Sequence, residues 1–198
     1  MATAASSPRD STPPPPPPPP SPIVILISYI VLGSLISFGA GRTPDGTLPR
    51  NIHRELAPTL IVVCGFLTSY SVWDVLAVGI AKQKHKYGEK RYTDHQQMPE
   101  EVYLAVRVQT NQVEQMPVFL VGSLSCALFV NGTVAGVMSL IWVLLRRGYA
   151  SAYRGAVGVP VSDIGLGKFT IPAYFMSNGM LMAAAVHAVR CLISEEFP

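Results

Sequence analysis

Charged residues are scarce in this sequence. Only 14% of its 198 residues are Asp, Glu, Lys or Arg, whereas 49% are hydrophobic, and the formal net charge is +3. The lysines and arginines cluster beside apolar blocks rather than on one face of a soluble module, so the composition excludes nucleic acid as a partner. The grouping of the apolar residues into blocks predicts a membrane protein.

Cysteine is also rare, and its surroundings argue against a disulfide framework and against a metal site. The three cysteines lie within apolar segments without a CxxC motif, and the four histidines share no helical register. This pattern indicates neither a disulfide framework nor a metal site. A catalytic cysteine would need a nearby histidine in a polar setting, and neither is visible. We therefore expect small buried hydrophobic residues at Cys64, Cys126 and Cys191.

The N-terminal part combines a proline-rich tail with a first apolar block. Residues 1–21 are polar and small and include a run of prolines from Pro13 to Pro20, which predicts a disordered, partly polyproline II tail. This tail is either a spacer or a ligand for an SH3- or WW-type domain. Residues 22–40 are long enough to cross a bilayer and predict an N-terminal transmembrane helix. A signal peptide is the alternative, but the prolines separate this block from its only upstream cation, Arg9.

Four further helices are expected in the rest of the chain. Apolar periodicity and turn residues place them at residues 56–81, 100–130, 133–153 and 168–193. The predicted fold class is all-α, an integral-membrane four-helix bundle over residues 56–193 with an extra N-terminal transmembrane helix and a disordered Pro-rich tail.

The distribution of Lys and Arg predicts the orientation. The loop 82–99 holds five of them and the segment 146–168 holds four, so both are expected on the cytoplasmic side, opposite the Asn131-Gly132 turn. Three arginines between residues 41 and 55 mildly contradict this orientation.

Two polar stripes run along the expected helices. Arg107, Asn111 and Glu114 lie at i, i+4 and i+7 and so share one helix face. A second stripe on the following helix consists of Arg146, Tyr149 and Tyr153. A charged side chain at membrane depth costs roughly 2.5–3.5 kcal/mol on insertion scales, so such groups usually face a bundle interior and a ligand.

The chemistry of these stripes predicts a zwitterionic ligand such as a small peptide. The planar fork of Arg107 suits a carboxylate, and Glu114 could accept an ammonium group. The alternative is an internal Arg107–Glu114 ion pair that only ties the bundle together. Seven residues along a helix span roughly 10 Å, so that alternative needs partners on other helices.

Together these motifs resemble the family of membrane-associated proteins in eicosanoid and glutathione metabolism, the MAPEG family. The resemblance rests on Arg107-x-Gln109-x-Asn111-x-x-Glu114-x-x-Pro117, on Arg146-x-x-Tyr149-x-x-x-Tyr153 and on the basic run Lys84-His85-Lys86-Tyr87. It implies a homotrimer of four-helix bundles that binds glutathione between neighbouring subunits. The residues implied to bind glutathione are Arg107, Asn111, Glu114, Arg146, Tyr149 and Tyr153 from one subunit, and Lys84 and Gln109 from its neighbour.

The chain departs from the enzymes of the family at the position that activates the thiol. Leukotriene C4 synthase-like members have an arginine seven residues after the second tyrosine, where this chain has Pro160, and Gln115 replaces a tyrosine of several enzymes. The loop that follows Tyr153 is similar to that of the non-enzymatic 5-lipoxygenase-activating protein. Lys168, at the start of the last helix, is the first candidate for a substitute cation and Arg154 the second. Anchoring of both at the membrane interface is the alternative.

These features predict a membrane-bound glutathione transferase or peroxidase. Glutathione would be the co-substrate, the second substrate would be a lipophilic electrophile or lipid hydroperoxide, and membrane lipid would surround the protein. The expected location is the endoplasmic reticulum or another endomembrane. The alternative is a non-catalytic lipid-binding scaffold. A small transporter would also explain the charges, but the sequence shows no inverted repeat.

Overall fold

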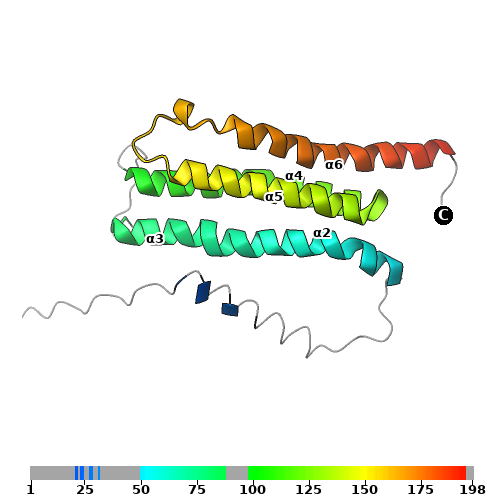
Figure 1. The fold of residues 1–198 in the computed structure, drawn as a ribbon, viewed down its shortest axis with the longest axis horizontal. Helices are drawn as coiled ribbons and strands as arrows, with labels where there is room; N and C mark the ends of the chain where they lie inside the picture. Colours follow the sequence, from blue (N-terminus) through cyan, green and yellow to red (C-terminus); the bar gives the residue numbers. More distant parts are fainter. Residues whose placement is uncertain are drawn as a thin grey trace, which may run out of the picture.

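Four long rods lie side by side and alternate in direction (Figure 1). The computed structural model describes residues 50–87 and 98–194, together with residues 21, 23, 24, 27, 28 and 31. Within these residues all regular structure is helical, which confirms the all-α prediction. The elements are α2 Arg50–Ser69, the π-helix η1 Tyr70–Val75, α3 Leu76–Lys84, α4 Glu100–Phe129, α5 Gly132–Arg154, the 3-10 helix η3 Val161–Ile164 and α6 Gly167–Ser194.

The predicted N-terminal segments lie largely outside the described residues. Ser21 is the only described residue of the expected tail at 1–21. Five residues of the expected helix at 22–40 are described and all are helical: Ile23, Val24, Ile27, Ser28 and Val31. Both segments therefore stay predictions.

The predicted helix boundaries are confirmed closely for three rods and less well for the first. The structure begins α4 at Glu100, with Glu101 also in its first turn, as the sequence predicted. The Asn131 side chain accepts a hydrogen bond from the Val134 amide at 2.9 Å and caps α5. The first rod runs from Arg50 to Lys84 and is longer than the predicted residues 56–81. The apolar pattern detects only its middle, because the first and last turns are polar but still helical.

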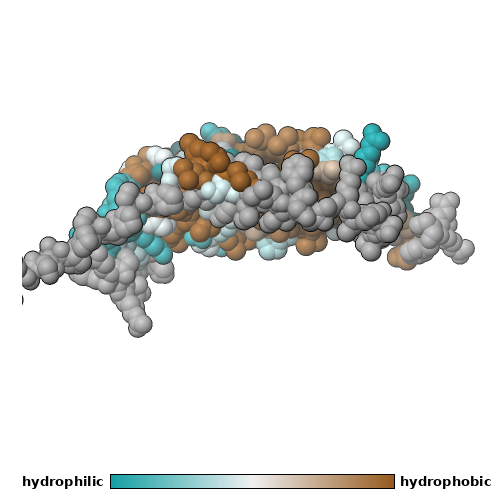
Figure 2. All heavy atoms as spheres, turned by 90° about the horizontal axis from the view of Figure 1, so that it is seen from below, coloured by the Kyte–Doolittle hydropathy of each residue, from teal (hydrophilic) through white to brown (hydrophobic). Residues whose placement is uncertain are grey.

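The bundle is built for a membrane. Three described helical segments are long and apolar enough to cross one: Arg54–Lys84, Glu100–Phe129 and Gly167–Ile193. Where grey atoms do not cover the visible face, apolar side chains predominate in its middle and hydrophilic ones lie mostly toward the two ends (Figure 2). The α5–α6 connection lies at the same end as the last turn of α3, opposite the Asn131 turn (Figure 1). The chain is therefore an integral membrane protein, and a spanning role for α5 stays a prediction.

An aromatic cluster forms the centre of the bundle. The rings of Phe119 and Trp142 are stacked with centroids 3.9 Å apart, and Phe66 meets both of them edge-on. All three side chains are buried, and they come from α4, α5 and α2 respectively. The cluster therefore holds three helices together.

Glycines allow α5 to approach α2 closely at the end near Asn131. A Cβ atom at Gly132 would lie 1.8 Å from the carbonyl oxygen of Glu55, and one at Gly136 would lie 2.9 Å from Cβ of Pro58. The hydroxyl of Thr59 donates a hydrogen bond to the Gly132 carbonyl at 3.0 Å. Small residues spaced four apart are a common means of close helix packing in membranes.

We expect Gly132→Ala to destabilise the bundle by about 1–3 kcal/mol or more, because its methyl group would collide with backbone. Gly79→Ala is the matched control, since no atom of the described residues lies within 4 Å of a Cβ there. Alanine is the better helix former, so that control should be neutral or stabilising by up to about 1 kcal/mol. Unfolding in mild detergent measures both, and equal effects would contradict the close approach.

Candidate functional site

Tyr149 and Tyr153 of α5 lie buried against α4. Their ring centroids are 5.6 Å apart, and they pack with Leu104 and Val108. The guanidinium of Arg107, on the same stretch of α4, lies close to the Tyr153 side chain. The two predicted stripes therefore meet at one α4–α5 contact, although they lie more than a helix length apart in the sequence.

Arg146 is fully buried and connects α5 to the polar stripe of α4. Its Nε donates to Oε1 of Gln112 at 2.9 Å, and its Nη2 donates to Oδ1 of Asn111. Its Cζ lies 4.6 Å from the Tyr149 ring centre. Its Nη1 is buried and has no hydrogen-bond partner among the residues that the structure describes. Sequence reasoning missed Gln112, because nothing in the pattern distinguishes this buried glutamine from its neighbours.

Arg107 and Glu114 lie on the exposed side of α4. Within the described part of the chain, no ion pair involves either of them. The alternative prediction of a mutual Arg107–Glu114 ion pair is therefore wrong. Two charged groups thus stand on the outer surface of a helix with the composition of a membrane span, where insertion is costly.

Lys84 and Gln109 do not join this cluster within one chain. Nζ of Lys84 lies 2.7 and 2.9 Å from the two carboxylate oxygens of Glu101, and Nε2 of His85 lies 3.0 Å from one of them. Gln109 is half-buried on α4. Lys84 therefore ties the end of α3 to the start of α4.

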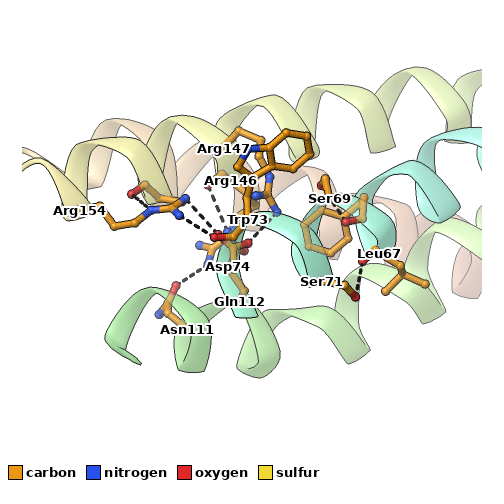
Figure 3. A network of polar contacts seen from close by, with 12 residues as sticks. Leu67, Ser69, Ser71, Trp73, Asp74, Asn111, Gln112, Arg146, Arg147 and Arg154 are labelled. Carbon is orange, nitrogen blue, oxygen red and sulfur yellow. Dashed lines mark hydrogen bonds and ion pairs between the residues drawn. The ribbon is translucent and has the colours of Figure 1, made fainter. Parts of the chain in front are cut away.

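A second polar cluster surrounds Asp74 in the π-helical segment (Figure 3). Its carboxylate is fully buried and accepts hydrogen bonds from Arg147 at 2.8 Å and from Arg154 at 3.0 Å. Arg154 also donates to the carbonyl oxygens of Trp73 and Ala150. Asp74 stands within an otherwise apolar stretch of the sequence, where a charge is unusual, but the sequence does not show which residues bind it.

The expectation for the cysteines needs one correction. Cys126 is buried as predicted, but Cys64 is exposed and Cys191 is half-buried. Moreover, Sγ of Cys191 lies 3.5 Å from Nε2 of His187. The spacing of four residues, one helical turn, was the signal for this pair. In the described residues no group of three or more His, Cys, Asp or Glu could hold a metal ion.

Residues 59–189 match the family model of the MAPEG family. The chain belongs to the MAPEG family. No curated protein matches the chain. Membership places it among membrane proteins of glutathione and eicosanoid metabolism, a family that contains both glutathione transferases and non-enzymatic members.

The loop between α5 and α6 contacts the start of α4. The backbone amide of Gly158 donates to Oε1 of Glu100 at 2.8 Å. Gly158 has a φ of 76°, which explains a glycine at this turn. Pro160 precedes the short helix η3 and is exposed. This hydrogen bond therefore fixes the loop to the start of α4, at the end of the bundle where α3 ends with Lys84.

Lys168 is exposed at the start of α6, one residue before that helix meets the cluster formed by Leu104, Val108, Tyr149 and Tyr153. The following residue, Phe169, packs against that cluster. A Cβ at Gly148 would come within 2.5 Å of the Phe169 ring, so α5 and α6 are close here. Among the described residues Lys168 forms no ion pair, whereas Arg154 is bound to Asp74.

An apolar groove of about 480 Å³ follows one face of α6 in this MAPEG bundle. Oη of Tyr174, at its wall, accepts a hydrogen bond from Gln115 of α4 at 3.3 Å. Gln115 thus connects the groove to the helix that carries the polar stripe. The lining residues are Ile171, Tyr174, Phe175, Asn178, Gly179 and Met182.

Proposed function

We propose that this chain is a membrane-bound glutathione transferase or peroxidase that acts on lipophilic electrophiles or lipid hydroperoxides. The observation that supports this most strongly is the pair of exposed charges on α4, Arg107 and Glu114, without ion-pair partners among the described residues. A peptide with carboxylates and one amine would neutralise both. The endoplasmic reticulum or another endomembrane is the proposed location.

The single chain leaves this site open, which favours an oligomer. Arg107 and Glu114 lie on the outside of the bundle, so a bound tripeptide would need a second wall. A neighbouring copy in a homotrimer would supply it, together with Lys84 and Gln109. Arg107, Asn111, Glu114, Tyr149 and Tyr153 would bind the peptide from the first copy. Arg146 would orient Asn111, to which it is hydrogen-bonded.

Glutathione would supply the thiol, and its sulfur would bond to the electrophilic carbon as the leaving group departs. A nearby cation stabilises the thiolate by lowering the thiol pKa. Lys168 is the better candidate for this cation, because the guanidinium of Arg154 is engaged by Asp74. The apolar groove on α6 is a suitable place for the lipophilic substrate, since it opens where lipid would lie.

The direct test is whether detergent-solubilised protein binds glutathione and conjugates it to a model aryl halide. Calorimetric binding together with turnover is the expected result. Absence of binding to the wild-type chain would overturn the proposal.

We expect Lys168→Ala to reduce conjugation by about tenfold while glutathione still binds, because the bound thiol would return toward its ordinary pKa of about 8.5. The ultraviolet absorbance of the thiolate, followed against pH in the complex, measures this shift. Lys168→Arg keeps the positive charge and should retain most of the rate. An unchanged titration in Lys168→Ala would assign thiol activation to another residue.

A second candidate function is a non-catalytic lipid-binding scaffold. Pro160 and the long loop between α5 and α6 favour it, because the arginine of the enzymes is missing there. Glutathione binding without any conjugation of aryl halides or reduction of hydroperoxides would support this scaffold over the enzyme.

A further inference from the structure

The first rod contains a π-helical turn at Tyr70–Val75, and side chains satisfy the backbone around it. The Ser69 hydroxyl donates to the Phe66 carbonyl at 2.8 Å, and the Ser71 hydroxyl donates to the Leu67 carbonyl at 3.1 Å. Within the turn, Arg154 donates to the Trp73 carbonyl at 2.9 Å. In Figure 3, Ser69 and Ser71 lie on one side of Asp74 and Arg154 on the other. Unsatisfied carbonyls are costly in a membrane, so these donors, above all Arg154 from another helix, stabilise the π-turn.

The same turn presents Asp74 to α5. Its side chain has no exposed surface, and each carboxylate oxygen accepts a hydrogen bond from a different arginine. Oδ2 binds Arg147 and Oδ1 binds Arg154. Because the two arginines lie seven residues apart, about two turns, they share a face of α5 and hold Asp74 between them. Because the arginine side chains have a limited reach, a large rotation or axial shift of α5 would break these bonds.

A different face of α5 carries the glutathione-site residues. Arg146 and Tyr153 directly precede the two arginines that bind Asp74. Consecutive residues of a helix point about 100° apart, so Arg146 and Tyr153 face a different direction from those arginines. They contact α4 through Asn111 and Arg107. Any rotation of α5 that moves Arg147 and Arg154 must therefore also move Arg146 and Tyr153.

The arginine pair is not an open anion site. Cζ of Arg147 lies 5.4 Å from the Phe66 ring centre. Its Nε and Nη1 are buried and have no hydrogen-bond partner in the described part of the chain. These two nitrogens have almost no surface that an anion could contact. The arrangement is closed around one carboxylate, which suits a fixed contact between helices rather than a binding site.

We propose that Asp74, presented by the π-turn, is a positioning residue for the glutathione site. It fixes the rotation of α5 through Arg147 and Arg154, and thereby aims Tyr153 and Arg146 at α4. This inference rests on the proposed glutathione binding. It also explains why Arg154 is a positioning residue rather than the cation that activates the thiol.

The test compares Asp74→Asn with Thr59→Val in full-length protein in detergent. Thr59→Val is the matched control, because it also removes a buried polar contact between α2 and α5, but at the far end of α5. The loss of one charge-assisted hydrogen bond to a ligand costs about tenfold or more in affinity, so Asp74→Asn should weaken calorimetric glutathione binding at least about tenfold. Thr59→Val should leave the glutathione Kd unchanged even where its melting temperature falls.

A second measurement separates positioning from general loss of structure. In a Tyr153→Phe background, the effect of Asp74→Asn on the Kd should shrink, because both changes act through the same hydroxyl. If Asp74→Asn does not fold, Arg154→Gln takes its place in the same comparison. This variant removes only one of the two arginine bonds to Asp74. Wild-type affinity in the Asp74 or Arg154 variant, or an equal loss in Thr59→Val, would overturn the positioning role while leaving the proposed function intact. Absence of binding to the wild-type chain would overturn both.

Discussion

Replacing Arg107 with alanine should raise the Kd for glutathione by about 10- to 100-fold, the largest effect expected of any binding variant. A charge-assisted hydrogen bond contributes about 1.5–3 kcal/mol, and each 1.4 kcal/mol corresponds to about tenfold in affinity. The side chain is exposed on α4, so its removal should not unfold the bundle. Isothermal titration of glutathione into detergent-solubilised protein measures the change.

Two matched variants sharpen this result. Arg107→Lys keeps the charge but replaces a planar fork by a point charge, so it should recover only part of the affinity. Arg54→Ala removes an exposed arginine near the start of α2 and should bind glutathione like the wild type. Wild-type binding in Arg107→Ala would leave the exposed charges of α4 without the role proposed for them.

Trp142→Ala should destabilise the bundle by about 3–5 kcal/mol, the range for truncating a large buried aromatic side chain. Trp142 is fully buried and stacks on Phe119 while Phe66 meets its edge. Because lipid is as apolar as the core, the loss arises from packing contacts and the cavity rather than from exposure to water. Unfolding by denaturing detergent, followed by circular dichroism, measures it.

The controls separate packing from hydrophobicity. Leu144→Ala removes an apolar side chain that is 62% exposed, so its effect should be small. Trp142→Phe keeps an aromatic ring and removes Nε1, a buried donor without a partner among the described residues, so it should cost much less than Trp142→Ala. A similar loss in Leu144→Ala would show that apolar area, not the aromatic cluster, determines stability.

The sequence predicted the helical part of the fold well because its signals are local. Apolar periodicity, the acidic pair Glu100-Glu101 and the Asn131 cap act within one or two turns, and the structure places the ends of α4 and α5 close to these residues. The π-turn at Tyr70–Val75 was not predicted, since its stability depends on Arg154 of another helix.

The candidate site was predicted in part. Helical spacing placed Arg107 with Asn111 and Arg146 with Tyr149 on shared faces, and the structure brings these two faces together. The helical spacing did not predict Gln112 as a partner of Arg146. The Cys191–His187 contact could have been predicted, because both residues lie on one helix one turn apart.

The sequence alone determined that this is a membrane-embedded bundle of helices and which polar side chains share a face, because helix geometry converts spacing along the chain directly into direction around an axis. Only the tertiary structure decided which faces meet. Arg154 binds Asp74, Arg146 binds Asn111 and Gln112, and Arg107 and Glu114 stay on the outside. Those outcomes depend on the rotation and axial offset between helices, which result from packing among residues far apart in the chain.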